Sequence, residues 1–599
     1  MDQRPWWRGQ AQQQISYSNV GTTTVGGVPV VSSGTLNGVQ PVVRNDSNLR
    51  DDRLFSAGWA NSYTVDAWTF KGDLSYSSAK REQSTLETYA GLRTGQSIGF
   101  DLQTSSGFGR YTLPDLSNPN TVYLWDPQGW GHDGRLEDSD QEDIIKAARL
   151  EASREFDSSS AVSSLDFGVN LNRRSKEKSA QVYFADLPNG RAPVLVDPSL
   201  LRSPTSLGFF GGADLLNFDP RRLLSRYYTL TLNQSNDDLR KDFIVEEDVD
   251  TYFVQANLDF PVGDTLQVRG NVGVQHIRTD QSSTGFNVGN GSVVGAQTLG
   301  TSYDDTLPSM NLVGDFGNGW MLRLGGAKTL MRPPINYLSA DSQASVSTTT
   351  RTWSGGGGNP LLEPYRATAA DLSLEKYIDA RTYFGVALFY KDLESYIYRS
   401  NQEWDFTGYA NNGIEPISNI GNFSTWENGQ GGYMRGVELS GALDAALLSP
   451  SLEGFGALVN VSYTESSIDP DPGDNSAGSD TIPGLSKVVG NATVYYEANG
   501  FSVRLSQRYR GAYRGEYGSL FGTRQYRFTK AERQLDLQLG YDLGDSIGVA
   551  GLSLIFQIYN LNNSPFRTEV SEATGTGIFL PEEHTEYGRQ YLLGVRYDL

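Results

Sequence analysis

Residues 501–514 read FSVRLSQRYRGAYR, and the pattern of this stretch decides the fold class. Its large apolar and aromatic side chains occupy odd positions, whereas its two serines and its four arginines occupy even positions. Successive side chains of a β-strand point to opposite faces, so the alternation predicts a strand with one apolar and one polar face. The same alternation recurs in 252–260, 266–275 and 534–543.

The length of the strands and the order of their connections narrow the choice of fold class. We count about 19 candidate strands after residue 50, many of about 12–18 residues, whereas strands of soluble proteins usually have about 5–6. Tight turns such as 65–66, 261–264 and 498–500 alternate with long polar segments, which are 114–141, 181–241, 282–301, 332–365, 400–430, 469–481, 517–528 and 563–584. Long tilted strands with short turns on one side are typical of outer-membrane barrels. The sequence therefore predicts an all-β protein, a transmembrane antiparallel β-barrel.

The composition argues against several other classes of protein. The 599 residues carry a formal net charge of −21, which disfavours nucleic-acid binding because a basic surface is needed to neutralise phosphates. Cysteine is absent, so disulfides, thiol chemistry and cysteine-based metal sites are excluded. The three histidines lie far apart in sequence, and no hydrolase, metalloprotease or kinase signature occurs. We therefore expect no enzyme, no cofactor and no bound metal.

Several motifs resemble the barrels of TonB-dependent outer-membrane receptors. They are DTLPSMNL (305–312), LRLGGAKTLMRPP (322–334), NPLLEPYRATAADLSLEKY (359–377), RGVELSG (435–441) and LIFQIYNLNNSPF (554–566). Their order and spacing match the C-terminal half of these receptors, and DAWTFKGDLSYSSAKRE (66–82) resembles the sub-group of xanthomonads and caulobacters. The last strand, 588–599, resembles the insertion signal read by the barrel assembly machinery, although Leu599 replaces the usual terminal aromatic residue.

The resemblance implies a 22-strand barrel, here truncated to about 20 strands. Residues 1–50 are then a barrel remnant and a long loop, with 10–20 as a wall strand, and 51–599 are the transmembrane barrel. The resemblance also implies that the N-terminal plug domain and its TonB box are missing from this sequence. TonB could then act only through that missing plug.

The same resemblance implies a function in the outer membrane of a Gram-negative bacterium. There the barrel would contact membrane lipid and lipopolysaccharide and take up a nutrient, either an oligosaccharide or a ferric siderophore. One alternative is a passive, porin-like diffusion channel without a plug. Another is a soluble β-rich adhesin or enzyme domain, which would fold in water without detergent.

Two sets of side chains are candidates for substrate contact. Arg504, Arg508 and Arg510 share the lumenal face of one strand, where they either contact substrate or balance Asp536 and Asp542 on the neighbouring strand. Five tryptophans of the long segments stand beside polar and acidic residues and either stack a sugar or another ring or pack within their own loops; they are Trp125, Trp130, Trp353, Trp404 and Trp426.

Three further features have weaker interpretations. The acidic segment 468–480 offers carboxylate oxygens for calcium but lacks the EF-hand spacing, which favours a solvated loop. His132, within WGHDG, could assist the aromatic residues near it. His276 shares a strand face with Val272 and Val274, which predicts packing rather than catalysis.

Overall fold

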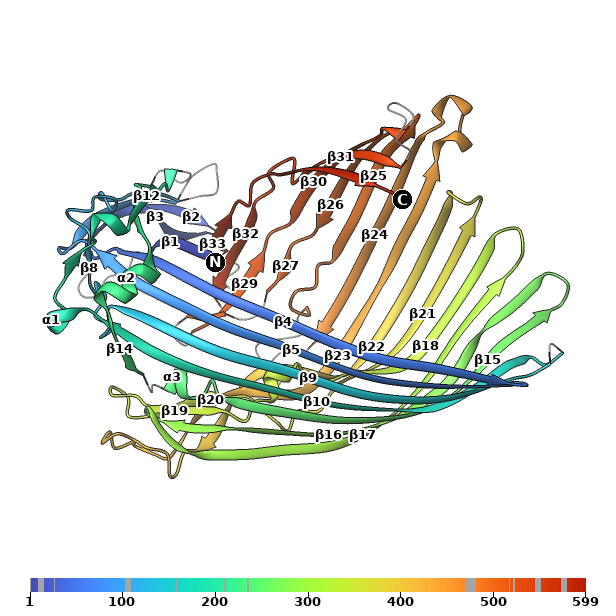
Figure 1. Ribbon diagram of the computed structural model, residues 1–599, viewed down its shortest axis with the longest axis horizontal. Helices are drawn as coiled ribbons and strands as arrows, with labels where there is room; N and C mark the ends of the chain where they lie inside the picture. The colour runs from blue at the N-terminus through green and yellow to red at the C-terminus, as the bar shows by residue number, and fades with distance from the viewer. Residues whose placement is uncertain are drawn as a thin grey trace.

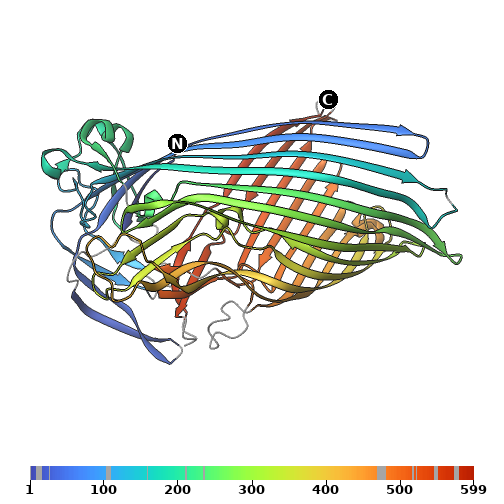
Figure 2. The ribbon, with the colours of Figure 1, turned by 90° about the horizontal axis from the view of Figure 1, so that it is seen from below.

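The structure is a computed structural model in which most of the chain forms one curved sheet (Figure 1). Turned by 90°, the sheet is seen to curl into a barrel (Figure 2). The described residues are 2–8, 16–25, 27–102, 109–157, 159–208, 212–233, 236–468, 481–515, 518–520, 523–544, 551–572 and 579–598. Most of the acidic segment, 469–480, and the terminal Leu599 lie outside them.

Hydrogen-bond ladders join 18 strands of the described chain in sequence order, each antiparallel to the next. These wall strands are β1 (Asp2–Arg8), β4 (Val42–Val65), β5 (Trp68–Gly91), β9 (Gly134–Glu155), β10 (Val162–Asp186), β15 (Phe243–Val262), β16 (Leu266–Gly289), β17 (Ser292–Asp315), β18 (Trp320–Met331), β21 (Tyr365–Tyr377), β22 (Tyr383–Asp405), β23 (Ile420–Asp444), β24 (Phe455–Ile468), β25 (Val488–Ala498), β26 (Phe501–Arg510), β30 (Glu532–Asp542), β31 (Leu552–Tyr559) and β34 (Gln590–Tyr597). The predicted all-β antiparallel barrel is confirmed.

Most of the remaining elements lie in the long connections, many of them gathered at the left of Figure 1. The strands are β2 (Ser16–Val25), β3 (Val28–Val39), β6 (Gln96–Asp101), β7 (Arg110–Thr112), β8 (Tyr123–Leu124), β11 (Val194–Leu195), β12 (Leu201–Thr205), β13 (Leu215–Phe218), β14 (Thr229–Leu232), β19 (Ser342–Val346), β20 (Trp353–Gly357), β27 (Tyr513–Arg514), β28 (Gly518–Leu520), β29 (Thr523–Thr529), β32 (Phe566–Glu572) and β33 (Leu580–Thr585). The helices are α1 (Pro188–Arg191), α2 (Pro220–Tyr227) and α3 (Asn236–Leu239), with 3-10 turns η1 (Pro198–Leu200), η3 (Ile335–Leu338), η4 (Ala445–Leu447) and η5 (Pro450–Leu452). None of the helices in the described ranges is long and apolar enough to cross a bilayer.

The wall exposes its apolar face, which is the reverse of a soluble protein. On β22 every second side chain is large, apolar and exposed; these are Phe384, Val386, Leu388 and Tyr390. The final strand β34 shows the same pattern at Tyr591, Leu593, Val595 and Tyr597. Phe501 is likewise exposed, and Leu535, Leu537 and Leu539 are only partly buried, so none of the four forms a compact core. An apolar exterior of this kind is stable only against hydrocarbon.

The tight turns use residues suited to a left-handed backbone. Asn499 and Gly500, with φ of 51° and 74°, join β25 to β26, as expected for an Asn-Gly hairpin whose backbone twist matches that of the strands. Asn290 and Gly291, with φ of 44° and 82°, make a similar turn between β16 and β17 at the other end of the wall.

The buried apolar residues lie in the long connections rather than in the middle of the wall. The first cluster, around α2 and β13, includes Leu215, Phe218 and Leu223. The second joins η3 to the wall through Val245, Leu338, Leu362 and Ile397. The third includes Trp353, Phe406 and Phe423. By strand alternation, Val245 and Ile397 point opposite to the exposed Val254 and Leu388, so the second cluster lies on the lumenal face.

Two details of the strand assignment differ from prediction. Residues 16–20 of the expected wall strand 10–20 belong to β2, which pairs with β3 in a separate four-stranded sheet, because the place of a segment in the chain does not specify its partner strand; residues 10–15 lie outside the described ranges. The predicted long loop 282–301 is instead a continuation of β16 and β17, because its Asn-Gly pair closes a hairpin. The resemblance implies about 20 wall strands, and the ladder of the described residues has 18.

Candidate functional site

The arginines of β26 are all engaged with neighbouring groups on the lumenal face. The guanidinium of Arg504 lies 2.6 Å from Glu497 Oε1 on β25, where the register places Tyr495 directly opposite Arg504. Arg508 donates a hydrogen bond to the side-chain oxygen of Gln534 on β30. Arg510 donates to the carbonyl oxygen of Gly484 at 2.7 Å, and its guanidinium stacks 3.9 Å from the ring centroid of Tyr513.

The prediction that Asp536 and Asp542 balance the charges of this arginine row is wrong. Asp536 accepts hydrogen bonds from the Gln534 side chain at 3.1 Å and from the backbone N–H of Asn560 at 2.8 Å. Asp542 accepts from the backbone N–H of Gly544 at 2.8 Å. The carboxylate beside the arginine row is that of Glu497, which lies on the other neighbouring strand.

Trp125 and Trp130 belong to an aromatic group at the loop end of β5 and β10. The indole N–H of Trp125 donates to the carbonyl of Gly91 at 3.2 Å, and Arg93 lies 5.1 Å from its ring centroid. Trp130 meets the Tyr89 ring edge-on, with ring centroids 4.7 Å apart.

His132 lies in the same group, where its imidazole stacks on Phe184 at 4.0 Å and an interplanar angle of 5°. Burial lowers the pKa of His132, and the nearby Asp126 carboxylate partly opposes that shift. The imidazole is therefore neutral at pH 7.

A buried ion cluster fixes the connection beside this group. Asp133, whose side chain is 1% exposed, accepts from Arg191 at 3.1 Å and from the backbone N–H of Leu187 at 2.9 Å. Arg191 also reaches Asp126 at 3.1 Å and Asp186 at 3.5 Å. The hydrogen bond to Asp133 is the largest of the effects that raise the pKa of Arg191. One cation thus holds together three carboxylates from two connections.

Trp426 lies on the lumenal face of β23, where it stacks on Tyr337 of η3 at 3.7 Å and an interplanar angle of 7°. The Asn359 side chain donates to the Trp426 carbonyl at 2.8 Å. These contacts hold the connection 332–364 against the lumenal face of the wall. Gln281 of β16 holds it further, because its side chain donates hydrogen bonds to the carbonyl oxygens of Pro360 and Leu362, each at 2.8 Å.

A buried carboxylate lies beneath that connection. The side chain of Glu247 is 2% exposed and lies 3.8 Å from both Arg174 and Arg332. Its Oε1 has no hydrogen-bond partner within the described chain. Lys176 nearby donates to the side-chain oxygen of Asn336 at 2.8 Å. The connection is thus held to the lumenal wall by polar contacts as well as by the second apolar cluster.

Trp353 belongs to the third cluster and Trp404 packs against it through Phe423, but the two differ in exposure. Trp353 is 2% exposed and packs on Phe406, with ring centroids 5.2 Å apart. Trp404 stacks on Phe423 at 4.8 Å while remaining 41% exposed.

The predicted residues therefore fall into separate groups. The five tryptophans lie in three aromatic clusters, and the arginine row lies on wall strands that contribute to none of them. The sequence analysis missed Tyr337, Phe423 and Glu247, because each gains its role from a partner more than 15 residues away in sequence. Across the described ranges, no group of three or more His, Asp or Glu side chains is arranged to hold a metal ion. The acidic segment 468–480, for which a solvated loop is favoured over a calcium site, lies almost wholly outside those ranges.

The family model described as "TonB dependent receptor-like, beta-barrel" matches residues 5–561. The chain belongs to the TonB-dependent receptor β-barrel family. Members of this family are transporters, and the family together with the barrel fold indicates an outer-membrane protein of a Gram-negative bacterium.

Solved receptor structures are similar to this chain at low identity. The siderophore receptor PiuA from Acinetobacter baumannii is 12% identical with a TM-score of 0.51, and the match covers 98% of this chain and 82% of that one. The ferric yersiniabactin uptake receptor FyuA from Yersinia pestis is 11% identical with a TM-score of 0.46, covering 98% and 81% of the two chains. The curated proteins contain no sequence that matches the chain.

Proposed function

We propose that this receptor barrel takes up an oligosaccharide, and that exposed aromatic side chains where the wall strands reach the long connections bind it. Trp404 carries the proposal, because Phe423 supports one side of its ring while the indole stays 41% exposed. A rigid, partly exposed aromatic ring is suited to stacking against the apolar face of a sugar. Gln402 shares its face of β22 and offers a polar group for sugar hydroxyls.

Charge supports an oligosaccharide over the ferric siderophore that we consider second. The net charge of −21 gives the protein an overall negative field, which disfavours anionic ferric complexes and leaves a neutral sugar unaffected. Transport would then depend on TonB acting through a plug domain. The division at residue 50 and assembly through the C-terminal strand stay predictions.

Binding to the purified barrel tests the substrate class. We expect oligosaccharides to change the intrinsic fluorescence, and Trp404→Ala to weaken binding about tenfold, equivalent to about 1.4 kcal/mol. Trp59→Ala is the matched control, because Trp59 is an exposed tryptophan of the apolar exterior and should leave affinity unchanged. Binding of ferric siderophores without binding of oligosaccharides would contradict the proposal. A steady conductance in planar bilayers that no sugar reduces would instead support the passive channel.

A further inference from the structure

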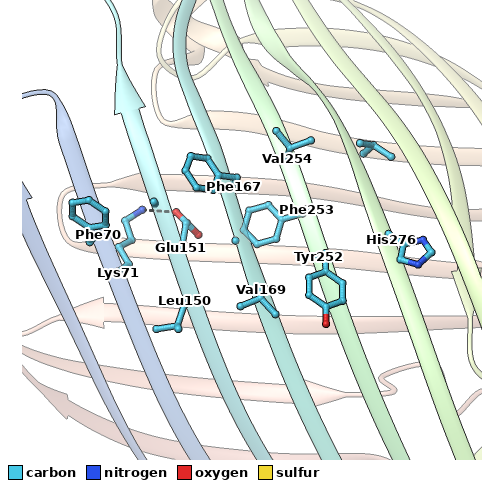
Figure 3. Close-up of a pocket in the computed structure, with 13 residues that line it drawn as sticks. Phe70, Lys71, Leu150, Glu151, Phe167, Val169, Tyr252, Phe253, Val254 and His276 are labelled. Atoms are coloured by element: carbon cyan, nitrogen blue, oxygen red, sulfur yellow. Dashed lines mark hydrogen bonds and ion pairs between the residues drawn. The ribbon is translucent and has the colours of Figure 1, made fainter.

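Aromatic rings that lie open on the exterior of the wall have a covered counterpart on its lumenal face. On the exterior, an apolar groove of about 670 Å³ is lined by exposed rings, among them Phe70, Phe167 and Tyr252 (Figure 3). On the lumenal face of β23, the ring of Trp426 instead carries the ring of Tyr337, stacked at 3.7 Å and an interplanar angle of 7°. A sugar or another flat ring would lie against an indole in the same way. Tyr337 therefore occupies the position that a ring-bearing ligand of Trp426 would take.

The connection 332–364, here called the strap, also engages the polar groups beside that indole. Asn428 lies two positions after Trp426 on β23 and therefore on the same lumenal face. Its side-chain nitrogen donates to the carbonyl oxygen of Glu363 at 2.7 Å, and its Oδ1 accepts from the backbone N–H of Glu363 at 2.8 Å. An amide offers the same donor and acceptor to sugar hydroxyls. The strap thus satisfies the groups that would bind a sugar at this place.

Glycines allow the strap to lie close against the wall on both sides of the strands that it connects. At Gly285 of β16, a Cβ atom would lie 2.7 Å from the backbone nitrogen of Asp341 in the strap. At Gly356 of β20, which belongs to the strap, a Cβ atom would lie 2.8 Å from the carbonyl oxygen of Ser424 on β23. Both distances are too short for a side chain, so the docked position depends on glycine at these two places.

The docked strap buries wall groups that it does not satisfy. Glu247 Oε1 and Gln281 Oε1 are buried on the wall beneath it, and neither oxygen has a hydrogen-bond partner within the described chain. A buried acceptor without a partner opposes the state that buries it. Docking is therefore weaker than its hydrogen bonds alone would make it, which allows a ligand to compete with the strap.

We propose that Trp426 and Asn428 form a second sugar-binding site, which the strap occupies until an oligosaccharide displaces it. This inference rests on the proposed uptake of an oligosaccharide and adds a site on the lumenal face. The sugar ring replaces Tyr337 on the indole, and its hydroxyls replace the backbone of Glu363 at the amide. Since only molecules with a released strap bind sugar here, the docked strap lowers the observed affinity of this site.

Isothermal titration calorimetry of the purified barrel with maltohexaose, xylohexaose and chitohexaose, each added separately, tests the site. Tyr337→Ala removes the internal competitor and should tighten the weaker of two sugar sites about tenfold, equivalent to about 1.4 kcal/mol. Adding Trp426→Ala to that variant should remove the second site. Tyr383→Ala is the matched control, because Tyr383 stacks on Tyr377 at the turn end of β22, away from the strap, and should change neither site.

An engineered disulfide tests whether the strap must leave the wall. Ser342 donates to the side-chain oxygen of Asn287 on β16 at 2.6 Å, so cysteines at these two positions can tie the strap to the wall. The chain has no other cysteine. The oxidised protein should bind sugar at one site, and reduction should restore the second. Cysteines at Ser345 and Ser354, which pair β19 with β20 inside the strap, are the control and should leave both sites intact.

The outcomes separate this inference from the proposed function. Unchanged sugar binding in Tyr337→Ala, or two sugar sites in the oxidised Asn287–Ser342 double-cysteine protein, would overturn the strap as a competitor. If Trp404→Ala still weakens binding in that case, the oligosaccharide function stands and only the second site is wrong. If none of the three sugars binds any variant, the proposed function fails together with the second site.

Discussion

Arg191 shows how single residues fix the long connections of this barrel. Its backbone has a positive φ of 65°, which is unfavourable for a residue with a Cβ atom. The carboxylates of Asp126 and Asp133 hold the side chain in that position, and both are almost fully buried. The strained backbone and the buried carboxylates are therefore stabilised by the same contacts.

Arg191→Ala should destabilise this connection strongly. It leaves the Asp133 carboxylate buried without a cation, which costs about 3 kcal/mol of local unfolding free energy. Hydrogen exchange of the Leu187 amide, which donates to Asp133, measures the effect. Arg226→Ala is the control, because Arg226 and its partner Asp197 are more exposed and the pair should contribute little. A similar loss of protection in both variants would contradict this role of Arg191.

The lowered pKa of His132 predicts that the same region is less stable at acid pH. Because burial lowers its pKa, the folded state resists protonation while the unfolded chain takes up a proton near pH 6.5. The contribution of neutral His132 to the free energy of unfolding is thus fully present above about pH 6.5. It is lost as the pH falls toward the lower pKa of the folded state. Hydrogen exchange near Trp130 between pH 8 and pH 5 should show this loss, and His132→Gln should flatten the profile. An unchanged profile in that variant would exclude His132 as the titrating group.

At the scale of the element, alternation along each strand separates lipid from lumen. Leu388 and Ala387 are neighbours on β22, yet one is exposed on the apolar exterior and the other lines a polar hollow beside Glu375 and Glu438. Adjacent positions of one strand therefore face different environments, hydrocarbon on one side of the wall and the polar lumen on the other.

Leu388→Arg should destabilise the barrel in lipid by about 2–4 kcal/mol, because a cation near the bilayer midplane loses its hydration. Ala387→Arg places the same side chain in the lumen and should cost far less. Reversible urea unfolding in vesicles compares the two variants directly. Equal destabilisation would show that β22 does not separate lipid from lumen.

Strand type and turn position could be predicted from sequence because both depend on neighbouring residues. The alternation in 501–510 and the Asn499–Gly500 turn are examples. The choice of partner could not, since residues 16–20, which the resemblance places in the wall, belong to β2 and pair with β3. The surroundings of Trp426 were equally unpredictable, because Tyr337 stacks on it from 89 positions away.

On the scale of the whole molecule, two kinds of apolar surface have different roles. The exterior of the wall exposes its apolar side chains, whereas the buried clusters tie the long connections to one another and to the ends of the strands. The wall therefore depends on the bilayer for its stability, and the connections depend on their own cores. We propose that the connections select the substrate, so that substrate selection can change without altering the wall.

Cysteine scanning of β22 tests the central claim most directly, namely that one face of each wall strand meets hydrocarbon and the other lines a wet interior. The chain has no native cysteine, so single cysteines at positions 384–391 can be introduced without background. In proteoliposomes, a water-soluble maleimide should label positions 385, 387, 389 and 391 and leave 384, 386, 388 and 390 unreacted. Uniform labelling, or labelling of the even positions alone, would contradict the account.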